Sequence, residues 1–228
     1  MADSDIIREV EEDLRRERYQ ALWNRYGGII VGAALVIIIG VAGYKGWHYW
    51  QQSRADSAGG RFEGALQLVR DGKDSEAEAV LEAIAKDAPA GYQTLARYRL
   101  AAEDSKAGRT AEALAQYQAL ADDAATDPIF RSYAQLKAAE VRVDEADFTE
   151  MQNRLTPLMA EAAPWRHSAR ELLGLAAYKA GEGDEAEKAF GLLIADPTVP
   201  QGMRQRAEMM LTLIAADTAK PPSAGDSN

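Results

Sequence analysis

The sequence predicts an all-α protein in which a single transmembrane helix near the N-terminus is followed by an α-solenoid of about four helix pairs and a capping helix. Three observations lead to this prediction. An uncharged run of nineteen residues extends from Tyr26 to Tyr44. After Gly60, Ala, Leu, Glu, Gln and Arg dominate and β-branched residues are few, a composition that favours helices. Turn residues in this second part recur at nearly even spacing, which indicates an internal repeat.

The uncharged run, YGGIIVGAALVIIIGVAGY, is long enough to cross a bilayer. Its nineteen residues span about 28 Å as a helix, and only a helix satisfies the backbone N–H and C=O groups of a single segment in lipid. Aromatic side chains typical of a membrane interface follow at its far end: Tyr44, Trp47, Tyr49 and Trp50. A buried helix of a soluble core is the alternative, but such a helix normally keeps a polar face. We therefore expect a transmembrane signal-anchor helix over residues 26–50.

The residues on either side of the anchor indicate that it is retained and how it is oriented. A cleaved signal peptide has a short basic region before an apolar core of about 7–15 residues. Here 25 residues precede the run, and the bulky residues 45–52 offer no small-x-small cleavage site. Near the ends of the run, four arginines lie before it and three basic residues after it: Arg15, Arg16, Arg18 and Arg25, then Lys45, Arg54 and Arg61. This bias places the N-terminus in the cytoplasm, and a long C-terminal domain can cross the membrane regardless of its charge.

Two polar segments flank the anchor. Residues 1–25 are expected to form a cytoplasmic amphipathic helix, because apolar residues follow helical spacing among charges of both signs. Two interpretations stay open for it: a solvated helix with internal ion pairs, or a helix that docks on the membrane or on a partner. Residues 51–59 form a linker or stalk, which either continues the membrane helix or breaks it at Gly59–Gly60.

Residues 60–216 contain a repeat of four units. The turn markers Gly72, Gly108, Ala146 and Gly181 stand 36, 38 and 35 residues apart. Each marker has a glutamate four positions later, large apolar residues nine and twelve positions later, and a small residue twelve positions earlier; a proline follows it by sixteen to twenty positions. The large residues are Leu81, Tyr117, Leu155 and Phe190, then Ile84, Leu120, Leu158 and Leu193, and the small ones are Gly60, Ala96, Ala134 and Ala169.

Each unit is thereby predicted to be a helical hairpin. The two large residues share one face of the second helix, and the small residue lets the first helix approach it closely. No hairpin can bury its apolar face alone, so stacked hairpins share a continuous core. The predicted helices cover residues 60–71, 74–87, 91–107, 110–124, 128–144, 147–161, 165–180 and 184–195, with a capping helix over 200–216.

The third unit departs most from this pattern. It has no turn glycine, and Pro157 lies inside its second helix, which predicts a kink or a break near Thr156. After the capping helix, residues 217–228 are polar and rich in small residues and are expected to form a disordered tail.

The repeats resemble the tetratricopeptide repeat, because the period is close to 34 residues and the small-residue, turn and proline positions agree in kind. The tryptophan and the paired Leu-Gly of a strong first helix are missing, and Leu173-Gly174 with Tyr178 comes nearest. With the start DIIREVEEDLRRERYQALWNRYGG and the anchor ending GYKGWHYW, the chain resembles a bacterial family of single-pass, tetratricopeptide-like ancillary subunits of the translocon. The resemblance implies an inner-membrane protein with its N-terminus in the cytoplasm and its repeats in the periplasm. It also implies association with the SecYEG channel and with a periplasmic chaperone of the prolyl-isomerase type, and it brings no catalytic residues.

Composition argues against several other functions. After Trp50 there are twenty basic and twenty-nine acidic residues, a net charge of −9, which argues against binding to nucleic-acid backbones. The chain has no cysteine, and its two histidines, His48 and His167, lie far apart. No paired nucleophile and base, glycine-rich phosphate loop or clustered metal ligands are recognisable. We therefore expect a non-enzymatic protein with no cofactor and no metal site.

Candidate contact residues lie in the first helices of the second, third and fourth units and in the anchor. First helices of such repeats usually line the concave surface, and the partner-binding candidates there are Tyr92, Arg99, Arg131, Tyr133, Arg170 and Tyr178. Aromatic and arginine side chains are enriched at binding hot spots, although a packed aromatic ring or a solvated charge is the alternative at each position. Gly28 and Gly32 have the G-x-x-x-G spacing that allows close helix approach in membranes, so a contact with a second copy or with a channel helix is the hypothesis, and a plain anchor is the alternative.

These observations predict a membrane-anchored scaffold that binds the translocon, a periplasmic chaperone or the emerging polypeptide during protein export. Two alternatives stay open. One is a scaffold for envelope assembly or cell division, where the same repeat type serves. The other is a regulatory subunit of a membrane enzyme or receptor. The sequence leaves the oligomeric state undetermined.

Overall fold

The computed structural model describes the backbone of residues 2–219 and the side chains of residues 23–29, 31–33 and 35–218. Within this part of the chain every regular element is a helix, which confirms the predicted all-α class. The chain divides into two units, Met1–Ser57 and Ala58–Asn228.

Helix α1 (Ala2–Arg70) belongs to both units. It forms the described part of the first unit and continues beyond Ser57 into the second. The helix has no break at Gly59–Gly60, so the segment after the apolar run is helical. The stretch Trp23–Arg70 includes a window long and apolar enough to cross a membrane, and 6% of that window is buried. The structure thus contains the long apolar helix that the sequence predicts, and its large apolar side chains described between residues 26 and 50 are exposed.

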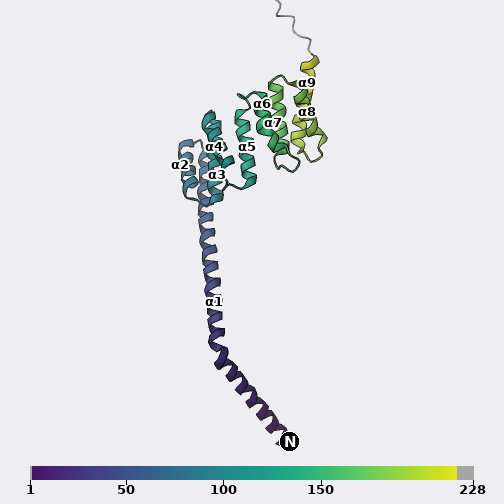
Figure 1. The fold of residues 1–228 in the computed structure, drawn as a ribbon. Helices are drawn as coiled ribbons and strands as arrows, with labels where there is room; N and C mark the ends of the chain where they lie inside the picture. Colours follow the sequence, from purple (N-terminus) through teal and green to yellow (C-terminus); the bar gives the residue numbers. More distant parts are fainter. Residues whose placement is uncertain (1, 220–228) are drawn as a thin grey trace, which may run out of the picture. The chain divides into compact units, whose positions relative to one another are not determined.

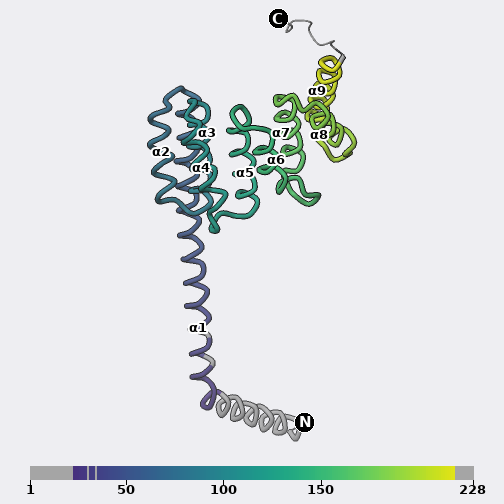
Figure 2. Tube along the Cα trace, turned by 45° about the horizontal axis from the view of Figure 1, so that its top comes forward, coloured from purple at the N-terminus to yellow at the C-terminus, as the bar shows by residue number. Residues whose placement is uncertain are grey.

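The second unit is built of helical hairpins, as the repeat predicts, and its helices follow one another in chain order from α2 to α9 (Figure 1), (Figure 2). After the end of α1 come α2 (Asp74–Asp87), α3 (Ala90–Lys106), α4 (Thr110–Asp122), α5 (Pro128–Arg142), α6 (Phe148–Leu155), the short 3-10 helix η1 (Thr156–Met159), α7 (Arg166–Lys179), α8 (Gly183–Ala195) and α9 (Gln201–Ala219). Each helix packs mainly on its neighbours in the chain, which is the arrangement of an α-solenoid. Helix α9 extends beyond the expected end at residue 216, and the rest of the expected tail, residues 220–228, lies outside the described residues.

The repeat positions form the core. The large residue nine positions after each marker is at most 2% exposed in all four units, and the one twelve positions after is at most 3% exposed. Three of the four small residues twelve positions before the marker, Ala96, Ala134 and Ala169, are also fully buried. Gly60 is the exception, since it is exposed and no atom would lie within 4 Å of a Cβ added to it. In the first repeat the close approach falls instead on Gly59, where an added Cβ would lie 2.7 Å from the Tyr92 hydroxyl oxygen.

A second row of small residues, seven positions before each marker, was not predicted. It consists of Ala65, Ala101, Ala139 and Gly174, all of which are buried. In the fourth unit a Cβ on Gly174 would lie 2.8 Å from the ring of Phe190. This row therefore sets how closely the two helices of a hairpin can pack.

The turn markers explain where the first helices end. Gly72, Gly108 and Gly181 have φ angles of 73°, 77° and 77°, a left-handed conformation that glycine adopts without steric cost. The glutamates four positions later lie in the first turns of α2, α4, α6 and α8, where the helix dipole favours a negative charge.

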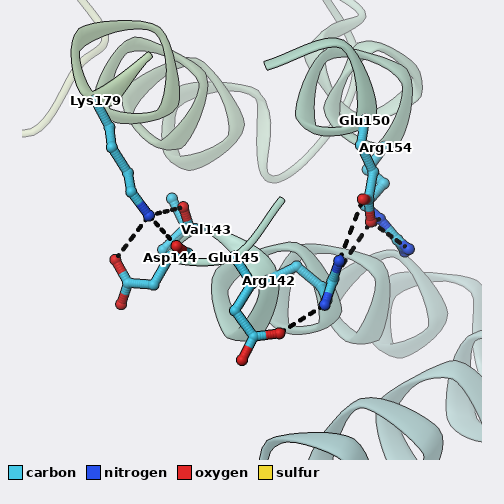
Figure 3. Close-up of polar contacts among 7 residues, drawn as sticks. All are labelled: Arg142, Val143, Asp144, Glu145, Glu150, Arg154 and Lys179. Carbon is cyan, nitrogen blue, oxygen red and sulfur yellow. Dashed lines mark hydrogen bonds and ion pairs between the residues drawn. The ribbon is translucent and has the colours of Figure 1, made fainter. Parts of the chain in front are cut away.

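In the third unit, side chains take the place of the missing turn glycine (Figure 3). Lys179 of α7 donates hydrogen bonds to the carbonyl oxygens of Val143, at 3.2 Å, and of Asp144, at the end of α5. Asp147 caps α6 by accepting a hydrogen bond from the backbone N–H of Glu150 at 2.7 Å. Orphan carbonyl groups at a helix end need partners, so a lysine from the next repeat stabilises a turn that has no residue with positive φ.

The predicted break near Thr156 is confirmed. Helix α6 ends at Leu155 and the chain continues as η1, which contains Pro157. The physical reason is that proline has no N–H group to continue the α-helical hydrogen bonds. The second helix of this unit therefore has eight residues, whereas α2, α4 and α8 have 14, 13 and 13.

Candidate binding surface

An aromatic cluster joins three consecutive repeats. Tyr98 of α3 lies 5.4 Å from Tyr133 of α5 between ring centroids, and Tyr133 lies 4.8 Å from Trp165, which directly precedes α7. Tyr98 also lies 6.3 Å from Phe130 and 6.1 Å from the buried ring of Tyr117. These separations are those of interacting aromatic pairs, so the rings form one continuous row across the helices α3, α5 and α7.

Two polar contacts hold this row to the first turn of α5. The Tyr98 hydroxyl donates a hydrogen bond to the carbonyl oxygen of Phe130, and the Trp165 indole N–H donates one to the carbonyl oxygen of Ile129 at 3.3 Å. Burial, with smaller contributions from neighbouring tyrosines, raises the pKa of Tyr98, and burial raises the pKa of Tyr117 to about 12. Both phenols therefore stay protonated at neutral pH, and Tyr98 remains a hydrogen-bond donor.

Apolar side chains beside the row are open to solvent. Ile129, Phe130 and Leu95 are 48%, 40% and 38% exposed, and Leu95 lies one helical turn before Tyr98 on α3. We call the six residues Leu95, Tyr98, Ile129, Phe130, Tyr133 and Trp165 the aromatic patch. Rigid, half-exposed aromatic rings with exposed aliphatic neighbours are the composition of a protein contact surface rather than of a finished core.

The loop that leads to this patch is acidic. Asp127 in this loop and Asp122 at the end of α4 are exposed, while Asp123 is held by an ion pair with Arg97 at 2.9 Å. The hydrogen bond from Arg97 is the main cause that lowers the pKa of Asp123. Asp127 also caps α5, since its carboxylate accepts a hydrogen bond from the backbone N–H of Ile129 at 2.9 Å. The local charge thus favours basic side chains in whatever binds the patch.

The structure distributes the six partner-binding candidates over several places. Tyr133 lies within the aromatic patch. Tyr92 packs on the first hairpin, 6.4 Å from the Phe62 ring. Tyr178 packs in the last core cluster and donates a hydrogen bond to Asp217 of α9 at 2.7 Å.

The three arginine candidates also lie apart. Arg99 forms an ion pair with Glu103 at 2.7 Å beside Tyr117. Arg131 is half-buried on α5, two residues before Tyr133. Arg170 lies 3.6 Å from the carboxylate of Asp196 and lines a separate groove. The structure therefore does not join the six residues into a single groove.

The glycine pair of the anchor has open surroundings. No heavy atom would lie within 4 Å of a Cβ added to Gly28 or Gly32 in the described part of the chain. A helix contact at this pair stays a prediction.

Sequence reasoning missed Tyr98, Phe130 and Trp165. A signal was present: Leu95, Phe130 and Trp165 stand 35 residues apart in succession, and so do Tyr98 and Tyr133. The markers of the second and third units are 38 residues apart, so the recurrence from Tyr98 to Tyr133 is out of step with the markers, whereas Phe130 and Trp165 both stand sixteen residues before their markers. Residues in different positions of their repeats consequently meet in one surface.

A cluster around His167 has the residue types of a hydrolytic site but not the geometry. His167 Nε2 lies 3.2 Å from the Thr198 hydroxyl and its Nδ1 lies 3.7 Å from Asp196. The Thr198 hydroxyl, however, donates to Asp196 Oδ1 at 2.6 Å and so does not give its proton to the imidazole. Burial, followed by the charge of Arg166, lowers the pKa of His167. A nucleophile needs a base that accepts its proton, and this arrangement instead ties the start of α7 to the turn before α9.

The fold and the aromatic patch define a class of protein: a helical-repeat scaffold that interacts with other proteins. The sequence profile of the tetratricopeptide repeat-like domain matches residues 20–215. Because the match covers most of the chain, the protein belongs to this family. Comparison with curated proteins and with solved structures gave no match. Repeats of this fold are typically non-catalytic scaffolds, and they bind protein partners.

Proposed function

We propose that this chain is a non-enzymatic scaffold of the bacterial inner membrane that binds polypeptides during protein export. Its apolar helix anchors it in the membrane with the N-terminus in the cytoplasm, and its repeats lie in the periplasm. The aromatic patch is the observation that carries the proposal, because it presents exposed apolar side chains on a rigid helical frame. The proposed ligands are the emerging chain, a periplasmic chaperone and the SecYEG translocon.

The patch suits an unfolded polypeptide segment of varied sequence better than one particular folded surface. Aromatic rings contact many different apolar side chains at a small cost in conformational entropy. Three packed rings, Tyr98, Tyr133 and Trp165, give the patch rigidity, whereas Ile129 and Phe130 supply the exposed contact area. The acidic residues of the preceding loop add attraction for lysine and arginine, which slows dissociation little but favours encounter.

Photocrosslinking in cells tests this proposal. A photoreactive amino acid replaces Phe130, which is 40% exposed, and in a matched control it replaces Leu213 of α9, which is 50% exposed. The proposal expects adducts with exported chains, a periplasmic chaperone or channel subunits from position 130 and not from position 213. Adducts with division or cell-wall factors alone would favour the alternative scaffold role.

Protease treatment of spheroplasts tests the orientation separately. The repeats should be degraded when the outer membrane is opened, because the proposal places them in the periplasm. Protection of the repeats in spheroplasts, with digestion only after the inner membrane is dissolved, would contradict the proposed topology.

A further inference from the structure

A groove of ≈ 310 Å³ opens between the second helices of the third and fourth repeats. It is separate in its lining from the aromatic patch. Helix α6 and η1 supply one side of it, α7 the floor and α8 the other side. The lining residues are Gln152, Met159, Arg170, Leu173, Glu185, Lys188, Ala189 and Leu192. We call this space the α6–α8 groove.

The broken helix of the third repeat explains the groove. Because α6 has only eight residues before Pro157 turns the chain into η1, it covers less of α7 than a full second helix would. Leu173 of α7 is consequently only partly buried, and Leu192 of α8 is 50% exposed. Both are apolar and face the same space as Met159 and Ala189, so the groove has an apolar floor and one apolar wall.

The charged residues at this groove differ in sign from the domain as a whole. Arg170 lies 3.6 Å from Asp196, but Arg166 and His167 each lie 3.7 Å from the same carboxylate oxygen. Among the described residues Arg170 makes no hydrogen bond, so its guanidinium N–H groups can donate hydrogen bonds to a ligand. Lys188 pairs with Glu185 at 3.4 Å and is exposed. Of the charged residues that line the groove, two are basic, Arg170 and Lys188, and one is acidic, Glu185, whereas the chain after Trp50 carries a net charge of −9.

We propose that the α6–α8 groove binds an amphipathic segment of a partner protein that carries both aliphatic and acidic side chains. The aliphatic side chains lie on Leu173, Ala189 and Leu192, and an Asp or Glu of the segment accepts hydrogen bonds from Arg170. The volume of ≈ 310 Å³ lies at the lower end of the range of ligand sites, and it accommodates a few side chains of a protein segment. The inference rests on the proposed role as a protein-binding scaffold and adds a second surface to it, opposite in charge preference to the aromatic patch.

A peptide titration with the full chain in nanodiscs tests the inference. Two fluorescein-labelled helical peptides of the same length contain leucine at helical spacing, and they differ only in carrying Glu or Lys at every polar position. Fluorescence anisotropy should show that the Glu peptide binds at least tenfold more tightly than the Lys peptide. Arg170→Gln should weaken binding of the Glu peptide about ten- to a hundredfold, because charge-assisted hydrogen bonds are lost.

Matched exposed leucines keep the test independent of folding. Leu192 and Leu213 are both 50% exposed, on α8 and α9. Leu192→Glu should abolish binding of the Glu peptide, while Leu213→Glu leaves it unchanged. Equal affinities for the two peptides, or equal effects of the two substitutions, would overturn the proposal.

Other occupants give different results in the same series. Saturable binding of decanoate to the wild type but not to Arg170→Gln, while neither peptide binds, would show an acyl carboxylate as the ligand, and the proposal would be wrong. A change in sedimentation with Leu192→Glu but no change in peptide affinity would show that a second copy covers the groove, and it would also contradict the proposal. Failure in any of these forms leaves crosslinking from Phe130 unaffected, so it is distinguishable from failure of the proposed function.

Discussion

Replacing Gly174 with alanine tests the packing that holds the fourth hairpin together. Gly174 is a buried residue in the middle of α7. A Cβ at this position would lie 2.8, 2.9 and 3.1 Å from three ring atoms of Phe190. Phe190 is 1% exposed and packs with Leu193, Val199 and Ile214 in the last core cluster, so its ring has little room to move.

Two opposing effects set the size of the change. Overpacking a well-packed core costs about 1–3 kcal/mol, whereas exchanging glycine for alanine inside a helix gains about 0.8–1 kcal/mol. We therefore expect Gly174→Ala to lower the free energy of unfolding by up to about 2 kcal/mol. At about 2–4 °C per kcal/mol for a domain of this size, the melting temperature falls by up to about 8 °C.

Gly191→Ala is the matched control. Gly191 also lies inside a helix, α8, but no heavy atom would lie within 4 Å of an added Cβ. This variant should gain the helix propensity alone and melt about 2–4 °C higher than the wild type. Thermal unfolding followed by circular dichroism measures both variants in the same detergent. If the two variants melt at the same temperature, the contact between Gly174 and Phe190 does not limit the packing of this hairpin.

Three further predictions concern the turns and the cluster at the start of α7. Lys179→Met should lower the free energy of unfolding by about 1 kcal/mol in urea titrations, since carbonyl groups at the end of α5 lose their partner; Lys188→Met, an exposed pair of similar type, should have no measurable effect. Gly108→Ala should cost about 1–2 kcal/mol in the same titrations because φ is 77° there, and no loss would show that the turn relaxes. The lowered pKa of His167 predicts that its contribution to stability is present above the unfolded value of 6.5 and is lost as pH falls through the folded pKa. Between pH 7.5 and 5, the melting temperature of His167→Gln should fall less steeply than that of the wild type. If the two slopes are identical, the pH dependence comes from carboxylates instead.

The helices were predictable from sequence because local chemistry fixes their ends. Gly72, Gly108 and Gly181 adopt the left-handed conformation that ends a first helix, and Pro157 ends α6. These effects depend on one residue and its neighbours in the chain. The buried positions followed from the same register, since a helical hairpin places every equivalent large residue against the same neighbour.

The binding surfaces were harder to predict because they depend on contacts between repeats. Tyr98, Tyr133 and Trp165 meet only when three repeats are stacked, and they occupy different positions in their own units. Arg170 lies beside a groove, but that groove is formed with the second helices α6 and α8 rather than on the predicted surface of first helices. Spacing within one repeat carries no information on such partners.

In a degenerate repeat, a side chain from another repeat can stabilise a turn that lacks its usual glycine. The third unit was predicted to differ because it lacks a glycine at its turn, and it does differ. What supports that turn is Lys179, which lies 35 residues farther along in α7 and donates to the carbonyl of Asp144. A lysine in the last turn of a helix is common, so nothing in the sequence marked this one as a cap for a different helix.

Binding of an unfolded polypeptide by the full chain in nanodiscs tests the central claim most directly. Reduced and carboxymethylated α-lactalbumin serves as the unfolded ligand, and fluorescence anisotropy gives its Kd. The double substitution Ile129→Ser and Phe130→Ser changes two exposed residues of the aromatic patch and should weaken binding about tenfold or more, because truncating a central aromatic contact costs at least about 2 kcal/mol. Leu213→Ser should leave the Kd unchanged. An unchanged Kd in the double variant, with Leu213→Ser equally without effect, would contradict the assignment of the aromatic patch as the polypeptide-binding surface.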